Sequence, residues 1–534
     1  MKRKSGIPPK EVDQIQPKKI ICNGVRYVDP ECRVKIDTAH VLTQRNDIYD
    51  VMLNQTNIGN NNNKFFLIQI IEDNNANNYN VWYRWGRVGR IGQCKLEPHG
   101  SNVTAAINAF SKKFLDKTGN DWINRSSFTK IPGKYDMVHL DENDGPVEEE
   151  SKSKTIIESK LSKAVADLIN LMCNLKSFEN QMKELNYDSA KLPLGKLSQI
   201  QINQGLDIIS KISETLKALQ DSEPKTRASR KKAKSASEIK ILERSLLQLS
   251  GDFYTKIPHD FGMRTPPVIN DMNVVDEKFK LLESLENVQY TIKVMKTTES
   301  SEEQINPLDL CYNNMKCQVT PLTMKDAEAV MVKEYFFTNA GATHVNFNYE
   351  ILDVYKVLKE DGIFEPKSDN KMLLWHGSRL SNWYSILSNG LKIAPPQAPS
   401  TGYMFGKGVY FSDCSTKSAN YVFPNEENNV GLMVLCCVDL GGVHQLKTSN
   451  YDLPAELPSG KLSAQGLGGS VPNPSEHRTI DGNCVVPIGK LISSEHTDLT
   501  LLYNEFIVYD TKQIDLRYLV KIFSRKSEFD IDLE

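Results

Sequence analysis

The stretch LLWHGS, residues 373–378, places a histidine, a glycine and a serine directly after three large apolar residues. The apolar run predicts a buried strand. Gly377 has no Cβ, so a ligand could approach its backbone N–H and C=O, and a primary carboxamide would fit that donor and acceptor. The strand end, with the titratable ring of His376, is therefore our first candidate for a binding site.

Three later segments also combine aromatic, glycine and ionisable residues: TGYMFGKGVYFSD (401–413), STKSANY (415–421) and LLYNEFIVYD (501–510). Ser418 and Tyr421 are three residues apart, which on a helix would put a hydroxyl and a flat ring on one face. Tyr410 could supply a second ring. Stacking adds only ~0.5–1.5 kcal/mol beyond area burial, so it could orient a planar ligand but not explain catalysis.

Glu505 is the candidate for a larger electrostatic contribution, because it interrupts a strand otherwise rich in Leu, Tyr, Phe, Ile and Val. A buried carboxylate needs a partner to offset its desolvation. A preorganised polar group aimed at developing charge is typically worth roughly 2.7–4 kcal/mol, so a carboxylate beside a cationic transition state could dominate catalysis.

Each feature has a structural alternative. A histidine at a strand end is more often a hydrogen-bonded structural residue than a catalyst, the glycines of GYMFGKG could be turn residues, and Glu505 could face water on an edge strand. The glycine spacing does not fit GxGxxG, so a Rossmann site is not indicated. The joint order of the segments along the chain favours a functional site.

The chain has 534 residues, which predicts two to four domains. Residues 24–140 alternate in the manner of strands, with KFFLIQII and NVWYRWGRVG as clear examples, and residues 103–117 fit a helix packed on that sheet. The amphipathic segments predict an all-helical domain over residues 158–297, with a polar, disordered insertion at 221–237. Residues 303–534 mix β-rich runs with turns. The acidic stretch 141–157 is expected to be a linker, and 1–23 a basic disordered tail.

Composition narrows the function classes. The net charge of −2 argues against a globally basic nucleic-acid binder, so any phosphate-binding surface must be local. The first 19 residues carry a local net charge of +4, typical of either a solvated tail or a nuclear-import signal.

No apolar run is long enough to span a bilayer, and the longest, GLMVLCCVDLGG, is expected to be a buried strand. The N-terminus lacks the apolar region of a secretory signal. We expect an intracellular protein with no membrane partner. The ten cysteines contain no CxxC pair, so we expect reduced thiols and no structural metal.

The chain resembles the poly(ADP-ribose) polymerases. His376 with Gly377, then Tyr410, then Glu505 match the His-Tyr-Glu signature of that family in order and context, and Trp85, Gly86 and Arg87 match the motif that names the WGR domain. KFLDKTGNDW and PGKYDM continue the WGR resemblance, and KLPLGKLS through FYTKIPHDFGM resembles the family's autoinhibitory helical domain. The resemblance implies a multidomain α+β fold: a β-rich WGR domain with a packed helix, an all-α regulatory domain, and a mixed α/β ADP-ribosyltransferase catalytic domain.

The resemblance also implies that the substrate is NAD+ and that no metal is required. Gly377 and Ser418 would hold the nicotinamide carboxamide, with Tyr421 stacked on one side of the ring and Tyr410 closing the other. Glu505 would polarise the nicotinamide ribose and orient the acceptor hydroxyl during elongation. The remaining contacts would come from His376, which binds the distal ribose, from Ser378 and Asn382 beside NAD+, and from Lys417 near Glu505.

In the WGR domain, the resemblance implies that a DNA strand break, a 5′-phosphorylated nick or end, is bound by Trp85 and Arg87, with Lys134 and Tyr135 on the same surface. DNA binding would loosen the helical domain, which otherwise blocks NAD+ entry. The single WGR domain, short basic N-terminus and absence of zinc fingers are most similar to the shorter nuclear members. Acceptors would be the protein itself and chromatin and repair proteins.

Two departures from the family pattern stand out. Lys392 occupies a position where close relatives usually carry Arg, so adenine-side contacts are expected to differ. The C-terminus reads SRKSEFDIDLE rather than ending in Leu-Trp, so docking of the accessory factor that redirects modification to serine is not expected. The sequence leaves three functions open: a DNA-break-activated polymerase, a DNA-dependent mono-ADP-ribosyltransferase, and a catalytically silent DNA-end-binding protein.

Overall fold

The computed structural model describes residues 28–45, 47–139, 158–174, 197–220, 235–299, 305–343, 347–360, 364–395, 403–422 and 429–526. The predicted basic tail at 1–23 and the predicted linker at 141–157 lie outside these ranges. The chain forms two compact units, one of residues 1–147 with 262–264 and the other of residues 148–261 with 265–534. None of the helices in the described ranges has the length and apolar character that crossing a bilayer would require.

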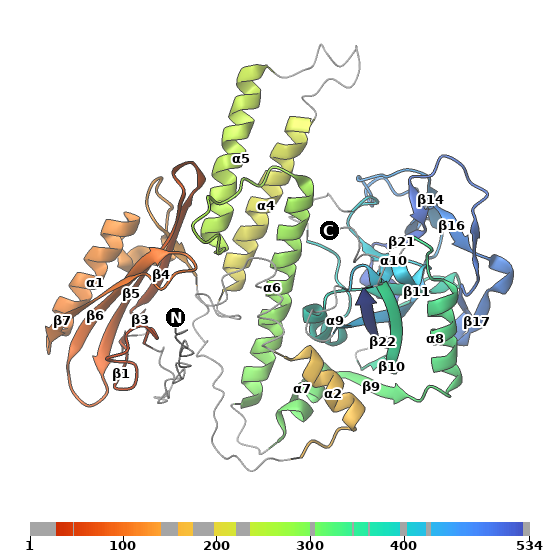
Figure 1. The fold of residues 1–534 in the computed structure, drawn as a ribbon, viewed down its shortest axis with the longest axis horizontal. Coiled ribbons are helices and arrows are strands. Elements are labelled where there is room, and N and C mark those ends of the chain that lie inside the picture. The colour runs from red at the N-terminus through yellow and green to blue at the C-terminus, as the bar shows by residue number, and fades with distance from the viewer. Residues whose placement is uncertain are drawn as a thin grey trace, which may run out of the picture. The chain divides into compact units, whose positions relative to one another are not determined.

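The first unit is an antiparallel sheet with strands in the order β7-β6-β5-β4-β8, and β1 also pairs with β5 (Figure 1). Alternate residues of its two long strands face helix α1, where Phe66 and Tyr83 pack with Phe110 and Phe114. The strands predicted at KFFLIQII and NVWYRWGRVG and the helix predicted at 103–117 are confirmed. The element bounds are β1 Ala39–Val41, β2 Thr43–Gln44, β3 Asp47–Ile48, β4 Asp50–Asn57, β5 Asn62–Asp73, β6 Tyr79–Arg87, β7 Gln93–Gly100, α1 Val103–Thr118 and β8 Asp136–Val138.

The second unit begins with helices whose apolar residues recur every three or four positions, as the sequence predicted. On α4, for example, Ile202, Ile209 and Ile212 are fully buried. The helices are α2 Lys163–Met172, α4 Gln199–Gln220, α5 Ala236–Lys256 and α6 Met272–Glu299, and Figure 1 shows the last three side by side.

The predicted insertion at 221–237 is wrong at its C-terminal end. Residues 221–234 lie outside the described ranges, but Ser235 caps α5 and the next two residues are already helical. The Ser235 hydroxyl accepts from the Glu238 N–H, and the Glu238 carboxylate accepts from the Ser235 N–H. This reciprocal capping box starts the helix within a stretch that looked uniformly polar.

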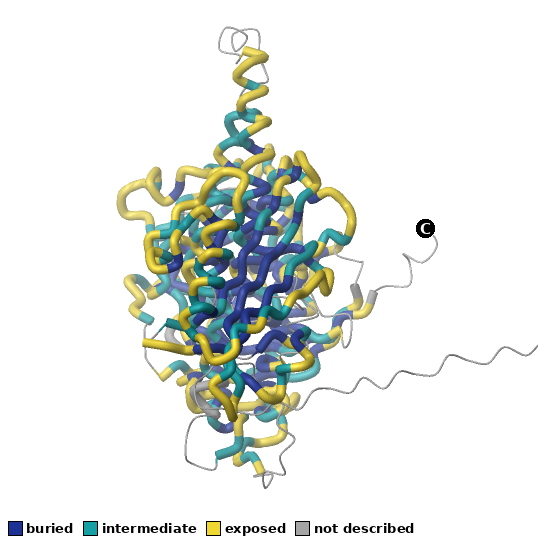
Figure 2. Tube along the Cα trace, turned by 90° about the vertical axis from the view of Figure 1, so that its left-hand side faces the viewer, coloured by how far each residue is buried: buried dark blue, intermediate teal, exposed yellow. Residues whose placement is uncertain are grey.

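The rest of the second unit is built on a seven-stranded sheet in the order β17-β18-β11-β13-β22-β10-β9. Strand β13 is the buried strand predicted at GLMVLCCVDLGG. Leu432 and Val434 face one core cluster, whereas Met433 and Leu435 face another, so both sides of the strand are covered. A strand buried on both faces reads as a continuous apolar run. Figure 2 colours the described residues by burial, with buried residues in dark blue and exposed residues in yellow.

Two smaller sheets complete this part, in the orders β12-β21-β15-β14 and β19-β16-β20. The remaining bounds are α7 Pro307–Met315, β9 Cys317–Leu322, α8 Ala327–Thr338, β10 Phe347–Lys359, β11 Lys371–Gly377, η4 Leu380–Asn382, α9 Trp383–Asn389, β12 Val409–Phe411, α10 Ser415–Ala419, β13 Val430–Asp439, β14 Val443–Leu446, β15 Ser463–Gly466, β16 Gly468–Pro472, β17 Arg478–Ile480, β18 Cys484–Val486, β19 Leu491–Ser493, β20 Leu501–Tyr503, β21 Glu505–Val508 and β22 Ile514–Lys526.

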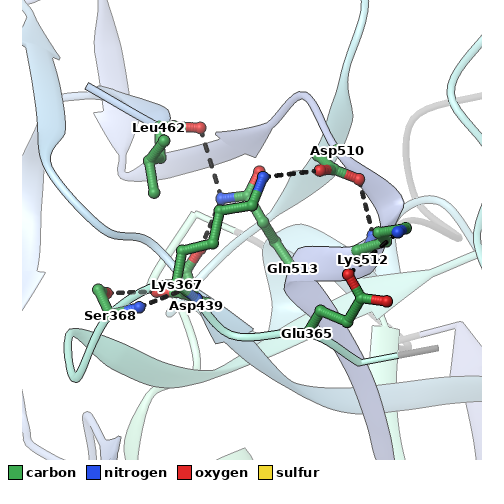
Figure 3. A network of polar contacts seen from close by, with 8 residues as sticks. All are labelled: Glu365, Lys367, Ser368, Asp439, Leu462, Asp510, Lys512 and Gln513. Carbon is green, nitrogen blue, oxygen red and sulfur yellow. Dashed lines mark hydrogen bonds and ion pairs between the residues drawn. The ribbon is translucent and has the colours of Figure 1, made fainter. Parts of the chain in front are cut away.

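A polar network fixes the loop that leads into β11 (Figure 3). The fully buried carboxylate of Asp439, at the end of β13, accepts from the backbone N–H of Lys367 at 2.5 Å and of Ser368 at 3.1 Å. The Lys367 ammonium in turn pairs with Asp510 at 3.0 Å. Two backbone N–H groups and one ammonium thus tie the loop to Asp439 at the end of β13 and to Asp510, both far away in sequence.

Candidate active site

The end of β11 links the large sheet to the four-stranded sheet. The Trp375 N–H donates to the Ser412 carbonyl at 2.9 Å, and the Ser412 N–H donates back at 3.1 Å. One residue later, His376 Nδ1 lies 2.9 Å from the Tyr410 carbonyl oxygen. Because a carbonyl can only accept, Nδ1 carries the proton and Nε2 of the neutral ring keeps its lone pair. Burial lowers the pKa of His376, which favours this neutral form, although the Tyr410 bond opposes the shift.

Gly377 is required by backbone packing. A Cβ at this position would lie 2.0 Å from the Ser418 carbonyl oxygen and 3.0 Å from its carbon. The Ser418 hydroxyl donates to the Trp375 carbonyl at 3.0 Å, which holds α10 against the strand. The sequence argument explained this glycine by ligand access. The structure adds that no other residue lets the strand and α10 approach so closely.

Three tyrosines accompany the strand end. The Tyr410 hydroxyl donates to the Gly406 carbonyl at 2.8 Å and accepts from the Phe405 N–H at 3.0 Å, and its ring lies 5.8 Å from that of Tyr403. The predicted shared helix face of Ser418 and Tyr421 is wrong, because α10 ends at Ala419. The Tyr421 N–H still donates to the Ser418 carbonyl at 3.1 Å, so a turn rather than a helix relates the two side chains.

Glu505 opens strand β21, which lies between β12 and β15 and is therefore not an edge strand. Its carboxylate pairs with the Lys417 ammonium at 2.9 Å, and the two side chains are only 13% and 15% exposed. Lys417 also donates to the Tyr503 carbonyl at 2.9 Å. Burial raises the pKa of Tyr410, and partial burial raises the pKa of Tyr421, which is 49% exposed; the Glu505 charge raises both further. The alternative of a solvent-facing glutamate is thus ruled out.

The remaining predicted NAD+ residues occupy the turn after β11. Asn382 Nδ2 donates to the Ser378 hydroxyl oxygen at 3.0 Å, so these two predicted contacts act as one unit. Trp383 Nε1 donates to the Ser378 carbonyl at 3.2 Å and fixes the turn to α9. Lys392, which departs from the family pattern, is exposed beyond α9.

Helix α6 lies against these tyrosines. The Phe279 and Tyr403 rings meet at 6.4 Å, edge to face. Burial raises the pKa of Tyr403, and the carboxylates of Glu283 and Asp276 on α6 raise it further. Asp276 acts on Tyr421 in the same direction. The helix therefore presents an aromatic ring and negative charge to the predicted NAD+ residues. Sequence analysis did not identify this contact, because it joins segments over 100 residues apart.

The first unit carries a separate basic and aromatic surface at one end of its sheet. Trp85 stacks on Phe66 with centroids 5.7 Å apart, and the Lys117 ammonium lies 4.5 Å from the Phe66 centroid. Lys64 lies 5.3 Å from the centroid of the Tyr135 ring. Burial lowers the pKa of Lys117, and neighbouring lysines, including Lys113, Lys64 and Lys134, lower it further. Clustered ammonium groups beside flat rings suit a nucleic-acid end.

Of the four predicted DNA-binding residues, Trp85 and Tyr135 are thus part of this surface, and Lys134 adds to its charge. Lys134 Nζ also donates to the Asp116 carbonyl at 2.9 Å. Arg87 is paired with Lys64 across the β5–β6 ladder and donates to Asn61 and to the carbonyls of Gly262 and Arg264. Sequence analysis did not identify three lysines of this surface, Lys64, Lys113 and Lys117. The four-residue spacing of Lys113 and Lys117 on α1 could have indicated that they share a helix face.

Within the described ranges, the nine cysteines are free thiols and no three His, Cys, Asp or Glu side chains are grouped as a metal site would require.

Comparison with known proteins identifies three domains in this chain. Residues 326–523 match the model of the poly(ADP-ribose) polymerase catalytic domain, residues 159–312 match that of the poly(ADP-ribose) polymerase regulatory domain, and residues 49–129 match that of the WGR domain. The chain is 42% identical over 517 residues to poly [ADP-ribose] polymerase 2 of Homo sapiens, covering 95% of this chain and 84% of that protein.

Two further relatives widen the comparison. Poly [ADP-ribose] polymerase 2 of Arabidopsis thaliana is 40% identical over 497 residues, covering 90% of this chain and 74% of that protein. Poly [ADP-ribose] polymerase 1 of Danio rerio is 36% identical over 511 residues, covering 94% of this chain and 48% of that protein. The similarity to each of these proteins extends over at least nine-tenths of this chain.

Proposed function

Because the chain belongs to the poly(ADP-ribose) polymerase family and is an NAD+ ADP-ribosyltransferase, we propose that a DNA strand break activates it. We propose further that it transfers ADP-ribose to proteins, including itself, and lengthens the attached chains in response to DNA damage in the nucleus. The observation that carries the chemistry is the largely buried Lys417–Glu505 pair beside Tyr410 and Tyr421.

The reaction breaks the bond between the nicotinamide nitrogen and the ribose, so the sugar becomes positively charged as nicotinamide leaves. Glu505 supplies a negative charge in a region of low exposure, where it is worth more than in water. The arriving acceptor hydroxyl must lose its proton, and the same carboxylate can accept a hydrogen bond from it. Lys417, anchored on the Tyr503 carbonyl, fixes the carboxylate in place.

The strand end would hold both ends of NAD+. The Ser418 hydroxyl has its proton directed to the Trp375 carbonyl, so its oxygen remains an acceptor for the carboxamide N–H, with the Gly377 backbone beside it. Neutral His376 offers Nε2 as an acceptor for a ribose hydroxyl. Tyr421 and Tyr410 would cover the nicotinamide ring, and Ser378 with Asn382 would contact the ligand farther along.

Activation by DNA would use the basic and aromatic surface of the first unit, made of Trp85, Tyr135, Lys64, Lys117 and their neighbours, together with Arg87. The contact of α6 with Tyr403 supports a role for the helical domain in limiting NAD+ entry, because its carboxylates would oppose the negative diphosphate of the substrate. Chromatin and repair proteins are the proposed acceptors.

The decisive experiment measures nicotinamide release from NAD+ with and without nicked, 5′-phosphorylated DNA, using the wild-type chain and Arg87→Ala. Wild type should release nicotinamide faster with DNA, and Arg87→Ala should lose most of that stimulation. Arg33→Ala is a matched control, because Arg33 is exposed near the opposite end of β5, where Lys35 pairs with Asp73. Equal rates with and without DNA would contradict activation, and a single-unit product on a gel would replace polymerase by mono-ADP-ribosyltransferase.

A further inference from the structure

A second carboxylate, that of Asp413, is linked to the Lys417–Glu505 pair through Asn504. Asp413 is only 3% exposed, and its Oδ2 accepts from Asn504 Nδ2 at 2.7 Å. Its Oδ1 has no hydrogen-bond partner on any other described residue. Burying a carboxylate with one oxygen unpaired costs free energy, so a position that keeps one calls for an explanation.

Asn504 connects this carboxylate to the residue next to it, Glu505. The Asn504 Oδ1 accepts from the Gly468 N–H at 2.9 Å, so both ends of its amide are engaged. Its backbone carbonyl accepts from the Ser412 hydroxyl at 3.1 Å and lies 3.4 Å from Lys417 Nζ. The residue sits in the one-residue break between β20 and β21, where ladder hydrogen bonds do not fix the backbone. Side-chain bonds to Asn504 therefore set where Glu505 begins its strand.

Asp413 also acts on Lys417 through charge. Burial raises the pKa of Asp413 to about 6, while the Asn504 hydrogen bond and the Lys417 charge limit the rise. The other titratable groups near this carboxylate are Tyr335 on α8 and Cys414, whose own pKa values Asp413 raises further. At neutral pH the Lys417 ammonium is thus attracted by two carboxylates, those of Asp413 and Glu505.

We propose that Asp413 and Asn504 are positioning residues for Glu505: their buried hydrogen bond fixes the Asn504–Glu505 backbone, and the Asp413 charge helps to hold Lys417 in line with the Glu505 carboxylate. The proposal rests on the transferase function. It predicts that this pair affects the rate of sugar transfer rather than the binding of NAD+, because neither side chain belongs to the strand end that holds the substrate.

The test measures kcat and KM for NAD+ by nicotinamide release from the full chain at saturating nicked DNA. Asp413→Asn keeps the shape but removes the charge, and Asn504→Ala removes the amide. Hydrogen bonds to charged groups are strong enough that each variant should lower kcat at least about tenfold, with KM changed less than about threefold. In the double variant, the loss in kcat should be clearly smaller than the product of the two single losses, because both changes weaken the shared Asp413–Asn504 hydrogen bond.

Asp439→Asn is the matched control. Asp439 is equally buried in the same domain and accepts several hydrogen bonds, but it fixes the loop before β11 (Figure 3). Its substitution should lower the thermal midpoint while leaving kcat within about twofold. If Asp413→Asn does not fold, Asn504→Ala carries the same comparison of kcat with KM.

Three results would overturn the proposal: kcat within twofold of wild type in Asp413→Asn, kcat losses that multiply in the double variant, or an equal kcat loss in Asp439→Asn. Nicotinamide release by the wild-type chain separately tests the transferase function on which the proposal rests. A wild-type chain that releases no nicotinamide would refute the proposed function, whatever the variants do.

Discussion

Replacing Gly377 by alanine should separate the strand end from α10. The added Cβ would lie 2.0 Å from the Ser418 carbonyl oxygen. The backbone fixes the position of both atoms, so no change of side-chain rotamer can relieve the clash. Forced separation in a packed core typically costs ~2 kcal/mol. Loss of the 3.0 Å bond from the Ser418 hydroxyl to the Trp375 carbonyl adds ~1 kcal/mol. The expected destabilisation is about 3 kcal/mol.

The measurement is the thermal midpoint of the catalytic domain within the full chain, followed by calorimetry. For a domain of this size about 3 kcal/mol corresponds to a fall of roughly 6–12 °C. KM for NAD+ should also rise, because the Ser418 hydroxyl would leave its place beside the Gly377 backbone. Gly469→Ala is the control: its Cβ would find nothing nearer than 3.8 Å. Similar midpoints for the two variants would refute the packing argument.

Three further outcomes are expected. Glu505→Gln should lower kcat by about 100-fold or more without loss of DNA affinity, whereas Glu328→Gln, which removes a more exposed ion pair of the same length elsewhere in the domain, should change kcat little; equal loss of DNA affinity would mean that Glu505 is structural. Lys117→Ala should weaken DNA binding and reduce the slope of log affinity against log salt by about 1; an unchanged slope would exclude a phosphate contact. Lys278 is buried against His259, and desolvation lowers its pKa to about 8. The unfolded chain therefore binds more protons than the folded chain between pH 8 and about 10.5. The free energy of unfolding should rise across that window by on the order of 3 kcal/mol. Lys278→Met should flatten the rise, and an equal rise in that variant would contradict the assignment to Lys278.

Much of the fold could be read from local pattern. The amphipathic helices, the β5–β6 pair and the buried strand β13 follow from apolar spacing, because each element buries one face or two against a core. The start of α5 escaped this reading, because its capping box depends on two side chains in a segment whose composition suggests a loop. The end of α10 before Tyr421 escaped it as well, because five helical residues leave no periodic signal.

The sequence by itself determined the residue types that do the chemistry: a ring nitrogen, a strand-end glycine, two tyrosines and an acid in an apolar strand, in an order that resembles one enzyme family. Only the tertiary structure shows why Gly377 cannot be replaced by a larger residue and which groups position the carboxylate of Glu505. Ser418 meets Gly377 across 41 residues, and Asp413 meets Asn504 across 91. Such contacts depend on how sheets and helices pack, and no local spacing encodes them.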